Sequence, residues 1–412
     1  MAMRAQGWMT RRAGLCGAAL VLGLGAVSHA DGAYTFTLIA DSTGLFSFAG
    51  YEPPSINAGG TVAFSARLDN GSEGIFTGTG AVPNVTTTIA DNSGAFQRFS
   101  APSINAQGTV AFRAVLDSGA QGIFTGTGAV PNATRTIADT TGGFNRVSVT
   151  PSINDAGTVA FLGNLAGGSS GIFTSDGTVP NATTTVADSS GRFFGFGEST
   201  DINAQGSVAF RADLNDRTIS IVKGNGSTPN VTTTIADDTG PLRTVGPSPA
   251  INNVGTVLFD ALLDAGGQGL FIGDGTVPNP IRTVADTFGP YLNFGSFYSI
   301  NAAGEVAFFA TLDSGVDGIF TGPDPLLDKV LQTGDALFGG SVAFVDVFTD
   351  ALNDAGQLAF YFELANGTRG IGRADPVVAQ ALPVSGTLPL LGIGLGMLAW
   401  LARRASPQAT AS

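Results

Sequence analysis

Short alternating runs of apolar and polar residues recur along most of this chain. The segment "TVAFRAVL" (109–116) places Val110, Phe112 and Ala114 on one face of an extended strand. Ala111 lies on the opposite face, which indicates that the strand is packed on both sides. The Gly, Thr and Pro content and the lack of a sustained 3.6-residue period argue against helical repeats. The pattern therefore predicts an all-β chain.

A turn motif stands before each strand of this type. It is Asn-x-x-Gly, and a Phe follows seven residues after the Asn in every copy. Asn favours the first position of a four-residue β-turn and Gly favours the last. Successive copies are 48, 49, 49, 49, 49 and 52 residues apart. The predicted structural turns are Asn57 with Gly60, Asn105 with Gly108, Asn154 with Gly157, Asn203 with Gly206, Asn252 with Gly255, Asn301 with Gly304, and Asn353 with Gly356.

Each repeat contains four predicted strands. The first ends in "PSIN" or a variant, the second is typified by "TVAFRAVL", the third by "GIFTG" and the fourth by "TRTIAD". A loop with a Pro-Asn pair, such as Pro131-Asn132, joins the third strand to the fourth. Four strands in a repeat of this length match one blade of a β-propeller. The coils of a β-solenoid, the main alternative, are usually much shorter.

The two ends of the repeat array predict a closed ring. The array begins with "YTFTLIAD", which matches a fourth strand. It ends with "LNDAGQLAFYFELANGTRGIGRAD", which matches strands one to three. The first segment can therefore complete the last blade, and this pairs two strand edges that would otherwise be exposed. We expect a seven-bladed β-propeller of four-stranded blades over residues 31–376.

Both termini carry predicted sorting segments. Residues 1–30 combine arginines, an apolar run and a small-residue end ("SHA"), the pattern of a secretory signal peptide. Residues 377–385 form a predicted linker and sorting motif. A hydrophobic anchor helix with terminal arginines is predicted over 386–404, and a cytoplasmic tail over 405–412.

The C-terminal segment "ALPVSGTLPLLGIGLGMLAWLARRAS" resembles PEP-CTERM and related tripartite sorting signals, which exosortase-type transpeptidases process in Gram-negative bacteria. The Pro-Glu-Pro of those signals is replaced by "LPVSGTLP", and "LPVSG" also resembles a sortase signal. An ordinary single-span anchor is the third interpretation. The first two imply an exosortase- or sortase-type enzyme as a processing partner, and all three imply a protein at the cell surface.

The repeats carry a second resemblance. Asn-x-x-Gly-x-x-Ala-Phe is complete in six copies, and the fifth has Leu258 in place of Ala. This is similar to the tandem NxxGxxAF-repeat proteins, exported bacterial surface proteins that occur with different C-terminal anchors ("choice of anchor"). The resemblance implies an exported, surface-attached product, and it brings no activity and no catalytic residues.

Composition narrows the available chemistry. The single His (His29) and the single Cys (Cys16) lie in the predicted signal peptide. The remaining chain therefore lacks the side chains of common zinc sites, His-based triads and Cys nucleophiles. Between Asp31 and Leu382, 32 acidic and 14 basic residues give a net charge of −18. Such a surface disfavours nucleic acid and anionic lipid and suits divalent cations or neutral ligands.

Acidic residues recur in register and are candidate Ca²⁺ ligands. An Asp ends each predicted fourth strand, where it can also accept hydrogen bonds from its own turn. The loops between strands two and three carry further acids on the same expected face of the ring. Oxygen-rich clusters of this kind suit Ca²⁺. The candidates are Asp41, Asp91, Asp139, Asp188, Asp237, Asp286 and Asp335 in the first set, and Asp69, Asp117, Asp264 and Asp313 in the second.

Two hypotheses of function follow. The first is a non-enzymatic, monomeric propeller, surface-anchored or secreted, that acts as an interaction or matrix module of the cell envelope or exopolysaccharide layer. Its partner is a polysaccharide or another surface protein, and it meets the membrane only through the C-terminal helix. The alternative is a carbohydrate-active enzyme, a hydrolase or lyase, that uses two carboxylates of the propeller face. The sequence singles out no catalytic pair and no cofactor besides Ca²⁺.

Overall fold

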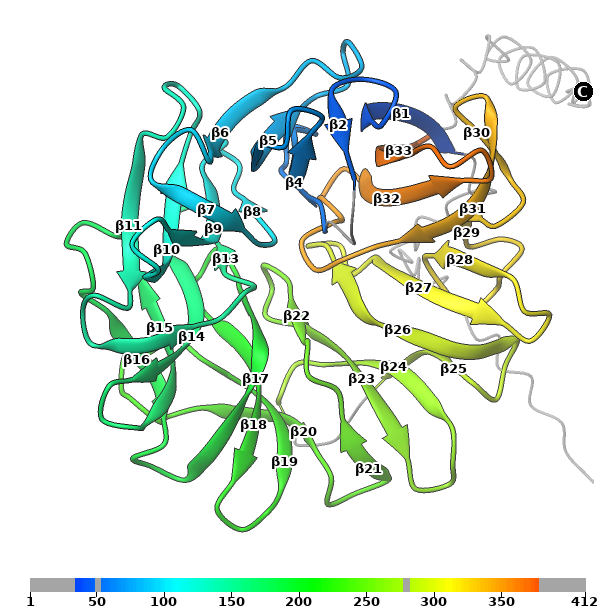
Figure 1. The fold of residues 1–412 in the computed structure, drawn as a ribbon. Helices are drawn as coiled ribbons and strands as arrows, with labels where there is room; N and C mark the ends of the chain where they lie inside the picture. The colour runs from blue at the N-terminus through cyan, green and yellow to red at the C-terminus, as the bar shows by residue number, and fades with distance from the viewer. Residues whose placement is uncertain (1–33, 49–52, 277–281, 378–412) are drawn as a thin grey trace, which may run out of the picture. The chain divides into compact units, whose positions relative to one another are not determined.

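The structure is a computed structural model that describes residues 34–48, 53–276 and 282–377. The described residues form seven antiparallel sheets arranged around a common centre, with no helix among them (Figure 1). The all-β, seven-bladed propeller predicted from the sequence is therefore confirmed. The predicted signal peptide, the sorting motif and the anchor helix lie outside the described residues. Within the described part of the chain, no helix has the length and apolar character to span a membrane.

Each blade contains an inner strand, two middle strands and an outer strand. In four blades the inner strand is split into two pieces. From inside outward, blade 1 contains β2 (Phe46–Ser47), β3 (Ser55–Ile56), β4 (Val62–Leu68), β5 (Glu73–Gly78) and β6 (Thr87–Asp91), and blade 2 contains β7 (Phe96–Phe99), β8 (Ser103–Ile104), β9 (Val110–Leu116), β10 (Gln121–Gly126) and β11 (Thr134–Asp139). Blade 3 contains β12 (Phe144–Val147), β13 (Ser152–Ile153), β14 (Val159–Leu165), β15 (Ser170–Ser175) and β16 (Thr184–Asp188). Blade 5 contains β21 (Leu242–Val245), β22 (Ala250–Ile251), β23 (Val257–Leu263), β24 (Gln268–Gly273) and β25 (Arg282–Asp286).

The other three blades have one inner strand each. Blade 4 consists of β17 (Phe193–Ile202), β18 (Val208–Leu214), β19 (Ile219–Gly224) and β20 (Thr233–Asp237), and blade 6 of β26 (Tyr291–Ile300), β27 (Val306–Leu312), β28 (Asp317–Phe320) and β29 (Lys329–Gln332). Blade 7 consists of β31 (Gly340–Asp346), which also pairs with the short β30 (Ala336–Leu337), then β32 (Leu358–Leu364), β33 (Arg369–Pro376) and β1 (Tyr34–Asp41).

The first strand of the chain closes the ring. β1 pairs antiparallel with β33, from Tyr34 opposite Pro376 to Asp41 opposite Gly370. Figure 1 shows this as the blue strand lying beside the orange one. The pairing predicted from the orphan strands at the two ends of the array is confirmed, and it leaves the sheet edge of blade 7 covered.

Hydrophobic cores lie between neighbouring blades. Phe112 on β9 is fully buried in a cluster that includes Ala63 and Ile75 of blade 1. Ala111, on the other face of β9, is also fully buried and packs in a cluster with Phe161 of blade 3. The alternation of large and small residues along the second strand therefore fits each blade between its two neighbours.

A pair of phenylalanines anchors each of several blades. Phe112 on β9 lies opposite Phe124 on β10, with ring centroids 6.1 Å apart. The Gly of "GIF" makes room for these rings, because a Cβ on Gly122 would lie 2.7 Å from the ring of Phe124. Equivalent Phe pairs stand in blades 1, 3, 5 and 6.

Candidate functional site

The seven Asn-x-x-Gly turns all form. In each, the Gly N–H donates to the Asn carbonyl at 2.9–3.0 Å. The seven glycines have φ between 73° and 85°, a left-handed conformation that favours Gly. The Asn side chains fold back on the same turn. For example, the Oδ1 atom of Asn203 accepts from the N–H groups of Gln205 and Ser207 at 3.1 and 2.9 Å.

The same seven Asn side chains also form a closed ring that links the blades. The Nδ2 atom of each Asn donates to the backbone carbonyl of the Asn in the next blade, at distances of 3.0–3.3 Å. The last bond, from Asn353 to Asn57, spans the closure of the ring. All seven Asn residues are buried. The repeated Asn therefore holds neighbouring blades together as well as making its own turn.

The Asp residues that end the outer strands form a second link between blades. Asp91 and Asn132 of the next blade exchange two hydrogen bonds, from the Asp91 N–H to Asn132 Oδ1 (2.8 Å) and from Asn132 Nδ2 to Asp91 Oδ1 (2.9 Å). The same clasp joins Asp41 with Asn84, Asp139 with Asn181, and Asp188 with Asn230. Each Asn has φ of 62–64°, a left-handed conformation that Asn tolerates. The Pro-Asn pairs thus position side chains for these clasps.

These clasps and turns use the Oδ1 atom of each Asp. Partial burial alone raises the pKa of Asp91, Asp139 and Asp188, but hydrogen bonds outweigh it and hold each pKa below its ordinary value. The donors are the clasping Asn and the hydroxyl and N–H two residues further on, such as Ser93 for Asp91. The carboxylates therefore stabilise their own turns and the contacts between neighbouring blades.

The structure does not gather the Ca²⁺ candidates into one site. Asp69, Asp117, Asp264 and Asp313 are exposed in separate turns. Throughout residues 34–48, 53–276 and 282–377, no three acidic side chains meet in a group that could hold a metal ion.

One candidate was assigned to the wrong position. Asp335 does not end an outer strand, because β29 ends at Gln332. Gln332 pairs with Gly318, which is the position that Asp139 occupies opposite Gly122 in blade 2. Asp335 lies in the following turn and forms an ion pair with Lys329 at 3.1 Å. The longer spacing of 52 residues before the last repeat reflects the extra β30–β31 hairpin inserted here.

The clasp makes a testable prediction. Asn132→Asp keeps an acceptor for the Asp91 N–H but sets a second carboxylate against Asp91 Oδ1. We expect a loss of about 2 kcal/mol in the free energy of unfolding at pH 7, because a hydrogen bond to a charged group is replaced by a like-charge contact. The loss should shrink below about pH 4, where a carboxyl is protonated. Urea unfolding at both pH values measures it, with the exposed Asn145→Asp as control. An equal loss at both pH values would contradict the clasp.

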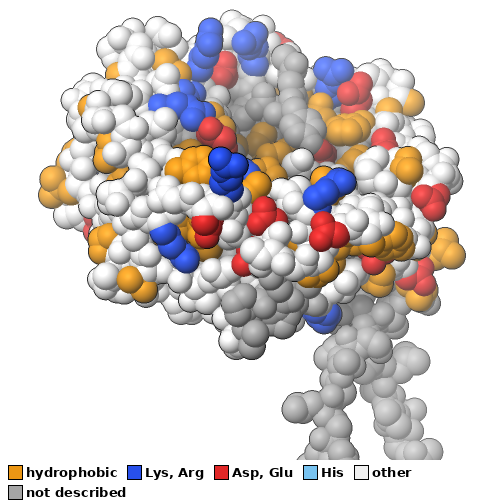
Figure 2. All heavy atoms as spheres, turned by 90° about the horizontal axis from the view of Figure 1, so that it is seen from below, with side chains coloured by type: hydrophobic (Ala, Val, Ile, Leu, Met, Phe, Trp, Pro, Cys, Tyr) orange, Lys and Arg blue, Asp and Glu red, His pale blue; other side chains and the backbone are white. Residues whose placement is uncertain are grey.

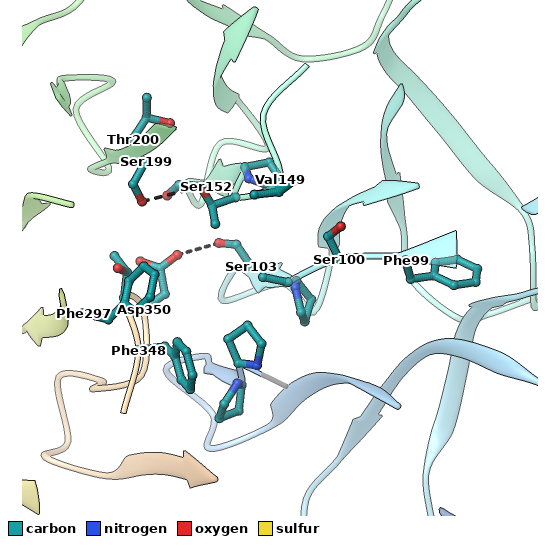
Figure 3. Close-up of a pocket in the computed structure, with 17 residues that line it drawn as sticks. Phe99, Ser100, Ser103, Val149, Ser152, Ser199, Thr200, Phe297, Phe348 and Asp350 are labelled. Atoms are coloured by element: carbon teal, nitrogen blue, oxygen red, sulfur yellow. Dashed lines mark hydrogen bonds between the residues drawn. The ribbon is translucent and has the colours of Figure 1, made fainter. Parts of the chain in front are cut away.

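A cavity of about 430 Å³ opens at the centre of the ring, where the inner strands of several blades converge (Figure 3). Its wall is partly aromatic: Phe297 and Phe348 stand side by side with ring centroids 5.4 Å apart, next to Asp350. Hydroxyl groups and prolines supply most of the rest. Further lining residues are Pro53, Pro54, Phe99, Ser100, Pro102, Ser103, Val149, Thr150, Pro151, Ser152, Ser199, Thr200 and Thr349. The volume and the mixed lining are typical of a small-molecule site.

Asp350 lines this cavity, and a second buried carboxyl, Asp201, contacts it from behind the wall. Asp201 is 5% exposed and accepts from Ser152 Oγ (2.9 Å) and the Ile251 N–H (2.7 Å). Asp350 accepts from Ser103 Oγ at 2.7 Å. Burial raises the pKa of both carboxyls, and the neighbouring charge of Asp350 raises the pKa of Asp201 further. The two side chains are in hydrogen-bonding contact with each other.

The sequence contains a signal for this pair outside the residues that recur in register. In the first three blades the segment before the turn is "PSIN", whereas it is "TDIN" in blade 4 and "DALN" in blade 7. Asp201 therefore replaces the usual Ser, and Asp350 the usual Pro. Two carboxyls that break the repeat at the innermost strand are a sign of a site at the axis, but only the closed ring brings blades 4 and 7 together.

Charges on the outer surface are mixed. On the face shown in Figure 2, Lys and Arg side chains are interspersed with Asp and Glu side chains instead of forming patches of one sign. Several form ion pairs, such as Arg146 with Glu198 at 2.8 Å. The face shown in Figure 2 therefore carries no patch of one charge that would attract a charged ligand.

The chain belongs to a family of unknown function, DUF7453, whose model matches residues 85–246 and 248–373. None of the curated proteins matches the sequence.

Solved structures are similar to this chain at low sequence identity. The WD40 domain of Toxoplasma gondii coronin is 12% identical, with a TM-score of 0.44 over 80% of this chain and 82% of that one. Prolyl oligopeptidase B of Galerina marginata is 12% identical, with a TM-score of 0.48 over 77% of this chain and 46% of that one. The six-bladed fungal lectin of Aleuria aurantia is 11% identical, with a TM-score of 0.34 over 67% of this chain and 92% of that one.

Proposed function

We propose that this protein is an exported, non-enzymatic propeller of the cell envelope or exopolysaccharide layer that binds a glycan in its central cavity. The observation that carries the proposal is the lining of the cavity. Aromatic rings provide apolar faces for a sugar ring, and hydroxyls and the Asp350 carboxyl provide hydrogen-bond partners around them. The signal-peptide and anchor-like segments of the sequence support export and attachment at the surface.

The carboxyl pair fits binding better than glycoside hydrolysis. Glycosidases hold two carboxyls about 5–9.5 Å apart, on either side of the scissile bond. Asp201 and Asp350 are in hydrogen-bonding contact, which leaves no room for a substrate between them. Among the described residues that line the cavity, Asp350 is the one acidic side chain.

The proposal is tested by screening the purified full-length chain against oligosaccharides. We expect retention of a glycan without release of product. Phe297→Ala should weaken that binding about tenfold, as truncation of an aromatic anchor usually does. The matched control is Phe194→Ala, because Phe194 is 59% exposed and is not among the lining residues. Product release would favour the carbohydrate-active enzyme instead. Retention that is equally sensitive to both substitutions would move the binding site out of the cavity.

A further inference from the structure

The donors around the Asp201–Asp350 pair are all neutral. Ser152 Oγ and the Ile251 N–H donate to Asp201, and Ser103 Oγ donates to Asp350. The two carboxyls contact each other, so an ionised carboxyl of the pair has a second carboxyl, and no cation, as its neighbour. No Lys, Arg or His is among the described residues that line the cavity. A buried charge without a counter-ion is costly, so the pair is poised to accept a cation.

Two unpartnered hydroxyl groups belong to the wall of the same cavity. Thr200 is 2% exposed, it lines the cavity, and its Oγ1 atom has no hydrogen-bond partner within the described structure. The Oγ1 atom of Thr349, also in the lining, is unpartnered in the same way. Both threonines directly adjoin an Asp of the pair in sequence, and Figure 3 shows Thr200 at the cavity. Buried polar atoms normally have a partner, so these two are vacant acceptors for a ligand that brings donors.

We infer that the cavity binds the ammonium group of a cationic amino sugar, held by the Asp350 carboxyl, which Asp201 contacts from behind, and by the two threonine hydroxyls of the wall. An ammonium group brings the positive charge that the pair lacks and three N–H donors for carboxyl and hydroxyl oxygens. The faces of Phe297 and Phe348 beside Asp350 add a favourable environment for a cation. This inference rests on the proposed function and specifies the ligand class of the same cavity.

The size of the cavity favours an organic cation over a bare metal ion. A water molecule occupies about 30 Å³, so about 430 Å³ leaves space for a sugar ring behind the ammonium group. The apolar part of the wall would contact that ring. A divalent ion would use the carboxyl and hydroxyl oxygens but would leave the aromatic wall without a role.

The experiment compares two disaccharides that differ in charge. The full-length chain is titrated calorimetrically with chitobiose in its fully deacetylated, diamine form and with neutral N,N′-diacetylchitobiose. We expect the diamine to bind at least about tenfold more tightly. Asp201→Asn and Asp350→Asn should each weaken diamine binding about thirtyfold or more, because each removes a buried partner of the ammonium charge. The same substitutions should change binding of the neutral sugar by less than about threefold.

The variants are matched for folding and charge. Asp350 has φ of 62°, which Asn also adopts readily, so Asp350→Asn preserves the backbone. Asp117→Asn removes one charge from an exposed turn and should leave both affinities unchanged. Circular dichroism and thermal melting confirm that each variant is folded before titration.

The outcomes separate this inference from the proposed function. If the neutral sugar binds as tightly as the diamine, or if the Asn variants retain full diamine affinity, the ammonium site is wrong and the glycan-binding propeller stands. If CaCl₂ gives heat that both Asn variants abolish while the diamine gives none, the pair is a metal site and the inference fails. If no glycan is retained in either experiment, both proposals fail.

Discussion

Replacing Asn203 with Ala is expected to lower the free energy of unfolding by about 3 kcal/mol, because three hydrogen-bonding groups each lose one hydrogen bond at once. These groups are the N–H groups of Gln205 and Ser207, which donate to Asn203 Oδ1, and the carbonyl of Asn252, which accepts from Nδ2 at 3.1 Å. Asn203 itself is 5% exposed, so water cannot easily replace the lost side chain. Urea unfolding of the variant measures the loss.

A second substitution separates the ring of Asn side chains from the turn. Asn203→Asp keeps an oxygen for the two N–H groups of the turn, and Asp is itself favoured at the first position of a β-turn. It replaces the Nδ2 donor with a carboxylate oxygen that faces the Asn252 carbonyl. If the ring stabilises the propeller, Asn203→Asp should lose nearly as much stability at pH 7 as Asn203→Ala. A near-neutral effect of Asn203→Asp would show that the turn alone matters. Asn145→Ala, at an exposed position of β12, should change stability by less than about 0.5 kcal/mol.

Local sequence patterns predicted the blades well because blades are built from local contacts. Alternation along "TVAFRAVL" determines which side chains enter the core, and the Asn-x-x-Gly turn fixes where the strand reverses. The orphan strands at the ends predicted the closure. The Asn ring was not predictable in the same way, because the Nδ2 of one Asn meets a carbonyl about 49 residues away only after the blades pack.

The links between blades were visible in the sequence only as separate parts. The Asp at the end of the outer strand and the Pro-Asn pair of the next repeat both recur in register, yet their contact spans 41 residues between Asp91 and Asn132. The Asp residues were therefore interpreted as candidate Ca²⁺ ligands, although their oxygens accept from neighbouring Asn and hydroxyl groups. The contact between Asp201 and Asp350 was harder still to predict from the sequence. Each is a visible departure from "PSIN", but their contact depends on the closed ring.

Asp346→Asn is expected to stabilise the protein at alkaline pH and to have little effect in acid. Asp346 ends β31 between the buried Val345 and Val347, and it is 6% exposed. Burial raises its pKa to about 7, although the Val347 N–H, which donates to the carboxyl at 2.6 Å, opposes the rise. In the unfolded chain the pKa returns to about 3.9. The folded state therefore binds a proton that the unfolded state has lost between these values.

The sign of the pH dependence follows from that difference. Because the folded pKa is the higher one, the contribution of Asp346 to stability is fully present below about pH 4 and is lost as the pH rises through about 7. A shift of this size corresponds to roughly 4 kcal/mol between the two limits. Asn cannot ionise and keeps an oxygen for the Val347 N–H, so the variant avoids the loss. Unfolding free energies of both proteins at pH 4.5 and pH 8 should show the gap widening by about 3 kcal/mol in favour of Asp346→Asn. Asp69→Asn, which removes a charge from an exposed turn, controls for net charge. A gap independent of pH would show that Asp346 is ionised in the folded protein across this range.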